Sequence, residues 1–230
     1  MKFILSIIII VMTAMVHANP NHLLPVPAYD SDGYDQAVFK SLIGNVRPEI
    51  WMVVRPSFEE EYAIVLYRDI EYEEAKGDMT YPRKAIRDEW LLSKISATQK
   101  IWAWKDIGEG RSILDIKPTD DVVKDSIAVN KADYEKIISA WKVALKTTRY
   151  PDSKNMGLDG TTYQFYAHYN LFGQTWSPKE GLPLNIVNLG AALEDIIKTK
   201  ENRKSALIKA NEIANRIINT NPNKASNPTP

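Results

Sequence analysis

The sequence of 230 residues contains no cysteine. Catalytic thiols, disulfide frameworks and cysteine-based zinc or iron–sulfur sites are therefore excluded. An excess of charge of one sign is also lacking, because 29 basic residues balance 29 acidic ones. Proteins that bind nucleic acids carry a basic field that neutralises phosphate, so we expect no nucleic-acid partner. No cofactor-binding motif is visible either, and we expect no cofactor.

Long apolar runs are missing except at the N-terminus. There, Met1 and Lys2 precede 14 largely apolar residues, and Ala18 follows Val16 by two positions. This order is typical of a secretory signal peptide. A permanent membrane anchor is the alternative, but 14 residues fall short of the ~20 that a helix needs to cross a bilayer. We therefore expect cleavage after Ala18, which removes residues 1–18 and leaves a periplasmic or secreted protein without a membrane span.

The rest of the chain is long enough for a single domain. Residues 19–218 can bury roughly 70% of their unfolded surface, so the core needs neither a metal nor a disulfide. The Pro-rich residues 19–28 are expected to be extended and solvated. Residues 219–230 are rich in Asn and Pro, and we expect a disordered tail there.

Two hairpins are predicted by runs of β-branched and aromatic residues. Residues 50–54 and 62–67 flank a short loop, and residues 161–167 precede a return strand over 172–176. Neither strand of the first pair alternates between apolar and polar residues. Both faces of this pair are therefore expected to be covered.

The chain between the two hairpins has a weaker pattern. Ile86 and Trp90 fit a turn of helix, whereas residues 101–104 are typical of a strand that ends near Lys105. Residues 106–129 are expected to form loops with one or two edge strands.

Helices are predicted by apolar stripes and capping residues. Asn130 can cap a helix that continues to Tyr150, and Asp35 can cap a shorter one that ends before Gly44. Two further helices are expected over residues 186–197 and 207–217. The fold class is therefore predicted to be α+β, with an antiparallel sheet built from two hairpins and packed with several amphipathic helices.

Few side chains are candidates for catalysis. Without the leader only His22 and His168 remain, and no His-x-x-x-His spacing supports a metal site. His168 could activate Ser177 or Thr175, but the sequence contains no Gly-x-Ser-x-Gly elbow. A histidine on the surface of a hairpin tip is the simpler interpretation.

Acidic residues also have simple explanations. The glutamates at positions 59–61 and at 71, 73 and 74 could supply a carboxylate pair for glycoside hydrolysis. Asp30 opens a stretch that resembles a calcium loop, but Ser41 stands where the closing glutamate is required. Solvated turns account for both patterns, so we expect no catalytic group and no metal here.

Aromatic side chains are the strongest candidates for binding. Trp102 and Trp104 share one face of their strand, and Tyr163 and Trp176 belong to the second hairpin. Exposed rings stack on sugars or on the side chains of a protein partner. Packing in the core is the alternative, because aromatic residues are usually buried. The sequence leaves open whether the face of Trp102 and Trp104 is core or exposed.

Two short motifs occur in the C-terminal third, Leu-Asp-Gly-Thr-Thr-Tyr at residues 158–163 and Gly-Gln-Thr-Trp-Ser-Pro at 173–178. They resemble a group of uncharacterised exported bacterial proteins that share an LDG-T/V-T-Y strand and a G-x-TWSP return strand. The resemblance implies no activity and no catalytic residue. Arg149, Asp159 and Thr175 could meet as a buried polar cluster, either structural or a small site.

These observations favour a non-catalytic protein that binds another protein, such as an inhibitor or immunity protein against a toxin or cell-wall hydrolase. A binder of small ligands or cell-wall glycans is the main alternative, and a hydrolase is the third. The candidate binding residues are Trp102, Trp104, Arg149, Asp159, Tyr163, His168, Thr175 and Trp176.

Overall fold

The computed structural model describes residues 22–26, 33–44, 46–73, 85–149, 160–168 and 170–220. The strands in this part of the chain are β1 (Pro48–Pro56), β2 (Tyr62–Tyr72), β3 (Ala85–Ala97), β4 (Trp102–Asp106), β5 (Ser112–Ile116), β6 (Val122–Val129), β7 (Thr161–Ala167) and β8 (Leu171–Trp176). The helices are α2 (Tyr34–Leu42), α3 (Lys131–Lys146), α4 (Gly181–Lys198) and α5 (Arg203–Asn219).

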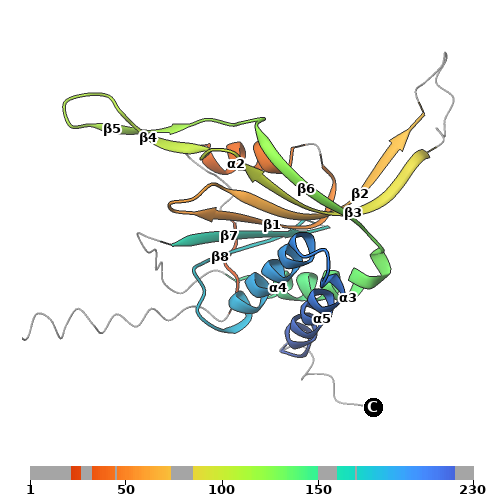
Figure 1. Ribbon diagram of the computed structural model, residues 1–230. Helices are drawn as coiled ribbons and strands as arrows, with labels where there is room; N and C mark the ends of the chain where they lie inside the picture. The colour runs from red at the N-terminus through yellow and green to blue at the C-terminus, as the bar shows by residue number, and fades with distance from the viewer. Residues whose placement is uncertain are drawn as a thin grey trace, which may run out of the picture.

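A six-stranded antiparallel sheet forms the centre of the fold, in the order β6-β3-β2-β1-β7-β8. Helices α3, α4 and α5 lie on one side of this sheet and α2 lies on the other (Figure 1). Strands β4 and β5 form a separate two-stranded antiparallel sheet. The predicted α+β class, an antiparallel sheet packed with amphipathic helices, is confirmed.

Both predicted hairpins are present and lie side by side in the sheet. β1 pairs with β2, β7 pairs with β8, and β1 also pairs with β7, where Met52 lies opposite Phe165. The sheet is larger than the prediction, because β3 and β6 extend it beyond β2. The two hairpins are therefore part of the sheet and not the whole of it.

The helical turn that Ile86 and Trp90 would fit is not formed, because both residues lie in β3. All of β2 pairs with β3, from Tyr62 opposite Ser96 to Tyr72 opposite Ala85. Backbone pairing of this length outweighs a weak local pattern, since strand formation depends on cross-strand neighbours more than on intrinsic preference.

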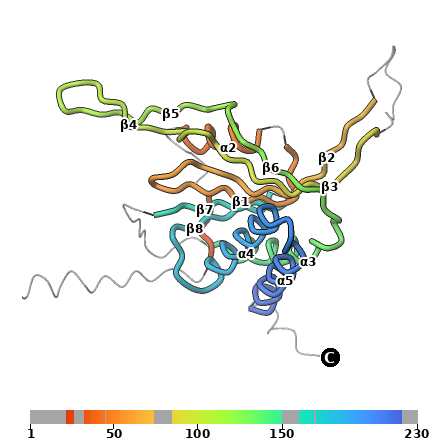
Figure 2. The backbone as a smooth tube through the Cα atoms, viewed as in Figure 1, coloured from red at the N-terminus to blue at the C-terminus, as the bar shows by residue number. Residues whose placement is uncertain are grey.

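The strand predicted to end near Lys105 is β4, and the edge strands expected after it are β5 and β6. β3 continues into β4 while β5 continues into β6, so the two pairs form one ribbon with an interruption. At the interruption the Thr98 N–H and hydroxyl both donate to the Asp121 carbonyl, at 3.3 and 3.1 Å. Beyond this point β4, β5 and their turn, residues 102–116, extend away from the main sheet (Figure 2). We refer to these residues as the arm.

The central strands are covered on both faces, as their uniformly apolar sequences predicted. Trp51, Met52, Val53 and Val54 are all buried in β1, and so is the run 63–67 in β2. Alternate residues enter different cores, because side chains of a strand point to opposite faces. Met52 and Val54 join the core beneath α3, α4 and α5, whereas Trp51 and Val53 join the core beneath α2.

Helix α3 begins where the sequence predicts. The Asn130 side chain accepts a hydrogen bond from the Ala132 N–H at 3.1 Å, which satisfies one of the free donors of the first turn. The helix ends at Lys146, four residues before the predicted end. Its predicted apolar stripe is fully buried: Tyr134, Ile137, Ile138, Trp141 and Leu145.

Helix α2 begins differently from the prediction. Gly33, with a φ of 74°, occupies the N-cap, and Asp35 lies in the first turn without capping the helix. Asp35 is instead held by side chains of the sheet, as described below. At the other end Gly44 has the expected positive φ of 53°, and its N–H donates to the Phe39 carbonyl at 3.0 Å.

Helices α4 and α5 cover the predicted ranges, and α5 continues through Asn219, the first residue of the expected tail. Gly190 lies where α4 approaches β1 so closely that a Cβ would collide with the Met52 sulfur. Glycine in a helix costs about 1 kcal/mol relative to alanine, and here it permits the close contact. Among the described residues, none of the helices is both long and apolar enough to cross a membrane.

The segment 22–26 is not a solvated lead-in, in contrast to the prediction. Leu23 is fully buried in the core beneath α3. Leu24 pairs with Gln174 through two backbone hydrogen bonds of 2.8 and 2.7 Å. The outer edge of β8 has unpaired backbone groups that this segment satisfies, and burial of Leu23 holds the segment in place.

We expect Leu23→Ala to lower the free energy of unfolding by about 2–5 kcal/mol, because it leaves a cavity in the core. Leu24→Ala is the matched control, since Leu24 is only half-buried and contributes its backbone to the bridge. Urea unfolding of both variants measures the difference. Equal losses for the two would contradict an anchoring role for Leu23.

Candidate functional site

The arm carries the two tryptophans that the sequence identified as candidates. Trp102 is half-buried at the base of the arm, whereas Trp104 is 66% exposed. Their rings meet edge to face, with centroids 6.4 Å apart and planes at 85°. This face of the strand is therefore open to solvent at Trp104 and partly covered at Trp102.

A buried carboxylate connects the base of the arm to helix α2 and the main sheet. Glu61, the residue before β2, is completely buried. One carboxylate oxygen accepts the Tyr34 hydroxyl at 2.6 Å, and the other accepts the Ile101 N–H at 3.0 Å. The Glu61 carbonyl also accepts the Ala97 N–H at 3.0 Å. Glu61 therefore joins α2, β2 and the residue before β4.

The environment of Tyr34 reinforces this junction. Burial, together with the hydrogen bond to Glu61 and the charge of that carboxylate, raises the pKa of Tyr34 far above its ordinary value. The hydroxyl therefore remains protonated and keeps donating to Glu61. Trp102 also forms a side-chain hydrogen bond with Tyr34, so the first tryptophan of the arm is tied to α2.

A second polar group lies beside this junction. Arg55 of β1 forms an ion pair with Asp35 of α2, and the same carboxylate accepts the Gln164 side-chain amide of β7 at 3.1 Å. The Arg55 guanidinium also lies 5.2 Å from the centre of the Tyr34 ring. These contacts explain why Asp35 does not cap α2: its carboxylate links the helix to two strands.

Lys100 lies at the base of the arm and contacts two aromatic rings. The Lys100 ammonium lies 5.8 Å from the ring centre of Phe58 and 5.2 Å from that of Trp102. It also donates to the Ser57 carbonyl at 3.1 Å. Phe58 is 75% exposed. Phe58, Lys100, Trp102 and Trp104 therefore form a continuous row, exposed at Phe58 and Trp104 and half-buried at Lys100 and Trp102, which we call the aromatic row.

The candidates on the second hairpin point to opposite faces of the sheet. Tyr163 lies opposite Thr175, and both face the core beneath α3. Trp176 lies opposite Thr162 and therefore faces the side of α2. Burial raises the pKa of the Tyr163 hydroxyl. Tyr163 and Trp176 consequently do not share one face of the hairpin.

The two motifs of the C-terminal third meet at one end of this hairpin. A Cβ on Gly160 would lie only 2.5 Å from the Ser177 hydroxyl and 2.7 Å from the Trp176 ring. The same hydroxyl accepts the Thr161 N–H at 2.9 Å, and Ser57 exchanges hydrogen bonds with the Gly160 backbone at 2.7 and 3.1 Å. This dense contact joins β1, β7 and β8 and is structural in character.

Of the polar cluster considered for Arg149, Asp159 and Thr175, the two described members differ in burial. Arg149 is exposed and its N–H donates to the Leu23 carbonyl at 2.9 Å, whereas Thr175 is buried. Asp159 lies outside the described residues.

His168 does not approach the hydroxyls considered as its partners. It is exposed at the end of β7, and its backbone N–H donates to the Glu49 carbonyl at 2.9 Å. Thr175 and Ser177 lie toward the other end of the hairpin, opposite Tyr163 and beside Thr161. With about 3.3 Å per strand residue, the separation is roughly 16 Å for Thr175 and more for Ser177.

Two of the remaining acidic candidates have structural surroundings: Glu61 is enclosed at the base of the arm, and Glu71 lies 3.8 Å from Arg87. Glu59 and Glu60 are exposed, and Glu74 lies outside the described residues. Of the calcium-like stretch, Asp30 and its two successors lie outside the described residues. Ser41, which replaces the closing glutamate, accepts the Thr119 N–H at 2.9 Å. Among the described residues no group of three or more His, Asp or Glu side chains could hold a metal ion.

A charged cluster that the sequence did not reveal connects α4 with β3. Glu194 accepts hydrogen bonds from Lys94 and Lys198, both at 2.7 Å. Burial opposes ionisation of Glu194, but these two cations outweigh burial and hold the pKa of the carboxyl below its ordinary value. The Lys94 ammonium also lies 4.4 Å from the ring centre of Tyr62. A hundred residues separate Lys94 from Glu194, so no local spacing could have identified the pair.

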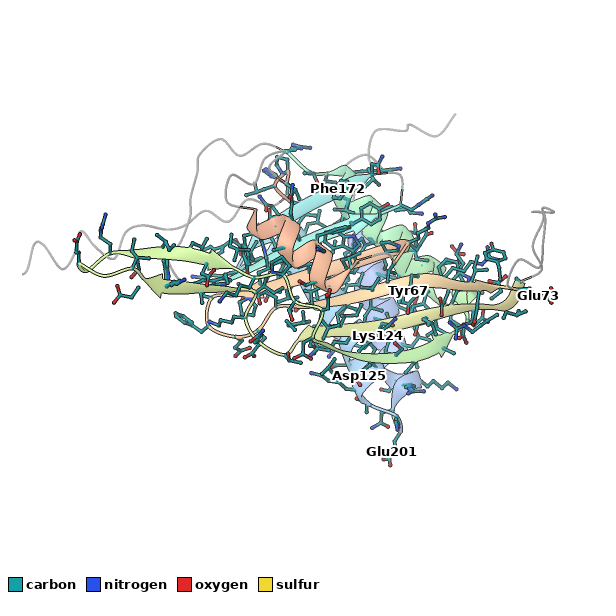
Figure 3. The ribbon with its side chains drawn as sticks, turned by 90° about the horizontal axis from the view of Figure 1, so that it is seen from above. Tyr67, Glu73, Lys124, Asp125, Phe172 and Glu201 are labelled. Atoms are coloured by element: carbon teal, nitrogen blue, oxygen red, sulfur yellow. The ribbon has the colours of Figure 1, made fainter. Side chains whose placement is uncertain are left out.

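A second aromatic cluster lies beside α2 near the β8 edge. Trp51 stacks on Tyr166, with centroids 5.8 Å apart and planes at 13°. The ring centroids of Phe39 and Phe172 lie 6.3 and 6.5 Å from that of Trp51. Phe172 lies next to α2 in Figure 3. Trp51 is buried, and the two phenylalanines are each a little under half exposed. This cluster is mainly packing, in contrast to the aromatic row.

Comparison with known proteins adds no relationship. No family model matches the chain, and no curated protein or solved structure is significantly similar to it.

We expect Tyr34→Phe to lower the free energy of unfolding by about 1–3 kcal/mol, because Glu61 loses a donor while remaining buried. Tyr67→Phe is the matched control: the Tyr67 hydroxyl is buried with no hydrogen-bond partner in the described structure, so its removal should be neutral or stabilising. Denaturant unfolding compares the two. Tyr34→Phe as stable as wild type would refute the junction.

We expect the charge state of Glu194 to make the free energy of unfolding depend on pH in the acidic range. Because its pKa is lower in the folded state, Glu194 contributes stability above the ordinary value of 4.5, and this contribution is lost as the pH falls through the folded pKa. Glu194→Gln cannot titrate and should lose less stability between pH 5 and pH 2 than wild type. Glu212→Gln, at an exposed position, should keep the wild-type slope. Thermal unfolding across this pH range measures both slopes.

Proposed function

We propose that this is an exported protein that binds another macromolecule and catalyses no reaction. The observation that carries the proposal is the aromatic row, which presents Phe58 and Trp104 to solvent at 75% and 66% exposure. Exposed apolar residues are ordinary when scattered, but large apolar patches on a protein surface mark sites of interaction. The row brings these two exposed rings together at the arm and its base, with Lys100 and the half-buried Trp102 between them.

The chemistry of the row fits recognition of a protein. Tryptophan is among the residues that contribute most binding free energy at protein interfaces. Trp104 is also presented by a base that is fixed through Glu61 and Tyr34, so little ordering of that base is needed on binding. An inhibitor or immunity protein against a toxin or a cell-wall hydrolase is one concrete form of this function.

Export is supported by the sequence of the leader. The charged start, the apolar run and Ala18 favour removal of residues 1–18 and release into the periplasm or the medium. A partner would then be another protein of that compartment.

Glycan binding is the second candidate, because exposed tryptophans also stack on sugar rings. The 85° angle between Trp102 and Trp104 disfavours it, since two perpendicular rings do not form a flat platform. Tryptophan fluorescence titrated with soluble cell-wall fragments distinguishes the two functions. We expect no change in emission, and a saturable shift would favour the glycan.

The binding function is tested by comparing tagged wild type with Trp104→Thr after purification from periplasmic extract. We expect a protein that co-purifies with wild type, and at least tenfold weaker binding of that protein to the variant. Ile208→Thr, on the exposed side of α5, is the control and should bind like wild type. No co-purifying protein, together with a detectable turnover by the purified chain, would contradict the proposal.

A further inference from the structure

The segment 22–26 is bound to the rest of the chain largely through its backbone. Leu24 and Gln174 exchange both of their backbone hydrogen bonds, at 2.8 and 2.7 Å, and the Arg149 N–H donates to the Leu23 carbonyl at 2.9 Å. Proteins that bind extended peptides by strand addition use the same backbone pairing along the edge of a sheet. The outer edge of β8 therefore receives this segment as it would receive a separate peptide.

A single buried side chain makes this contact selective. Leu23 is fully buried in the core beneath α3. Gly173 of β8 makes room for it, because a Cβ there would lie 2.9 Å from Leu145, 3.0 Å from the Thr148 hydroxyl and 3.1 Å from Leu23. In strand addition the backbone bonds provide affinity and the fitted side chains provide selectivity. The edge of β8 thus accepts an extended segment that carries a leucine at this position.

We propose that the segment 22–26 exchanges between two copies of this chain, so that the segment of each copy pairs with β8 of the other. A second copy carries the same segment, which makes the same hydrogen bonds and the same leucine contact between chains as within one. Exchange of an identical element is a route to a symmetric dimer that costs little free energy. The inference goes beyond the proposed function and does not depend on the aromatic row.

The connection to α2 determines where the two copies meet. From Val26 to Gly33 the chain advances seven residues, which span at most about 25 Å when fully extended. The β8 edge of one copy must therefore lie beside α2 of the other. Pro25 and Pro27 favour an extended backbone at the residue before each of them, which suits a bridge between two copies.

An exposed apolar surface lies at this meeting point. Phe172 of β8 is 43% exposed, and Phe39 of α2 is 45% exposed. Both rings contact the buried Trp51, and Figure 3 shows Phe172 next to α2. A dimer in which β8 of each copy lies beside α2 of the other covers these rings. Their burial gives the dimer a favourable contribution that the monomer lacks.

The exchanged dimer leaves the arm accessible. β8 and β6 are the two opposite edges of the main sheet, and the arm extends from β3 and β6. A dimer that is joined along β8 therefore carries two arms, one on each copy and both away from the interface.

Disulfide trapping tests the exchange, because the chain contains no cysteine of its own. Leu24 and Gln174 form a hydrogen-bonded antiparallel pair, in which the Cα atoms lie about 5.5 Å apart, a separation that a disulfide can bridge. Leu24→Cys and Gln174→Cys are purified separately, mixed at high concentration and oxidised. We expect a covalent dimer linked between positions 24 and 174, identified by mass spectrometry of the linked peptides. Neither single variant can form this bond within one chain.

The matched control mixes Leu24→Cys with Ile208→Cys, since Ile208 is exposed on α5. Random collision alone can link these two positions, so we expect at least tenfold less linked product. The double variant Leu24→Cys/Gln174→Cys is oxidised at low concentration to lock the segment within its own chain. In sedimentation experiments wild type should form a dimer as its concentration rises, whereas the locked variant should remain monomeric until it is reduced.

The interface is tested with Phe172→Thr, which keeps the β-branched character that a strand favours. We expect the association constant of the dimer to fall at least tenfold, because a large aromatic contact is lost. Ile208→Thr is the control and should dimerise like wild type.

The results decide between exchange and pairing within one chain. A 24–174 bond between chains that is no more frequent than the 24–208 bond would overturn the proposal. A wild type that stays monomeric at every concentration, or a dimer that persists in the locked variant, would also overturn it. Failure of the double variant to form any 24–174 bond would remove the pairing on which exchange rests. None of these results changes the test of binding at Trp104, so the two proposals fail separately.

Discussion

Strands β1 and β2 are apolar on both faces, and the rest of the fold covers both faces against water. Each buried large aliphatic or aromatic side chain contributes about 1.5–3 kcal/mol only if it is fully removed from water. Three helices cover one face, and the other is covered by the nine-residue helix α2. A helix of that length is not stable alone, so its position must be held by contacts with the sheet.

The buried carboxylate of Glu61 supplies the central contact of this kind. An isolated ionised group in a protein interior is strongly destabilising, and it is tolerated only when its oxygens are hydrogen-bonded. Tyr34 and Ile101 provide those bonds from two different segments. The carboxylate that positions α2 therefore also fixes the base of the arm, which links the packing of the core to the presentation of Trp104.

The edges of the main sheet differ from the arm in chemical character. The β8 edge is paired with Leu24, and the β6 edge carries Lys124 and Asp125, both exposed. Charged side chains on an edge strand discourage pairing with other chains. The arm exposes Trp104 and Ile113, and Lys105 lies beside the first and opposite the second.

The sequence by itself determined the parts of the structure that depend on local pattern. The α3 stripe from Tyr134 to Leu145, the cap at Asn130 and the two hairpins follow from spacing and residue type, because neighbours in the chain decide them. The covered faces of β1 followed in the same way. Tertiary structure alone decided that β3 is a strand, that Leu23 is buried, and that Lys94 and Glu194 form a pair. It also decided that Trp104 is exposed while Trp102 is half-buried. Each of these depends on residues far away in the chain, whose approach a local pattern does not encode.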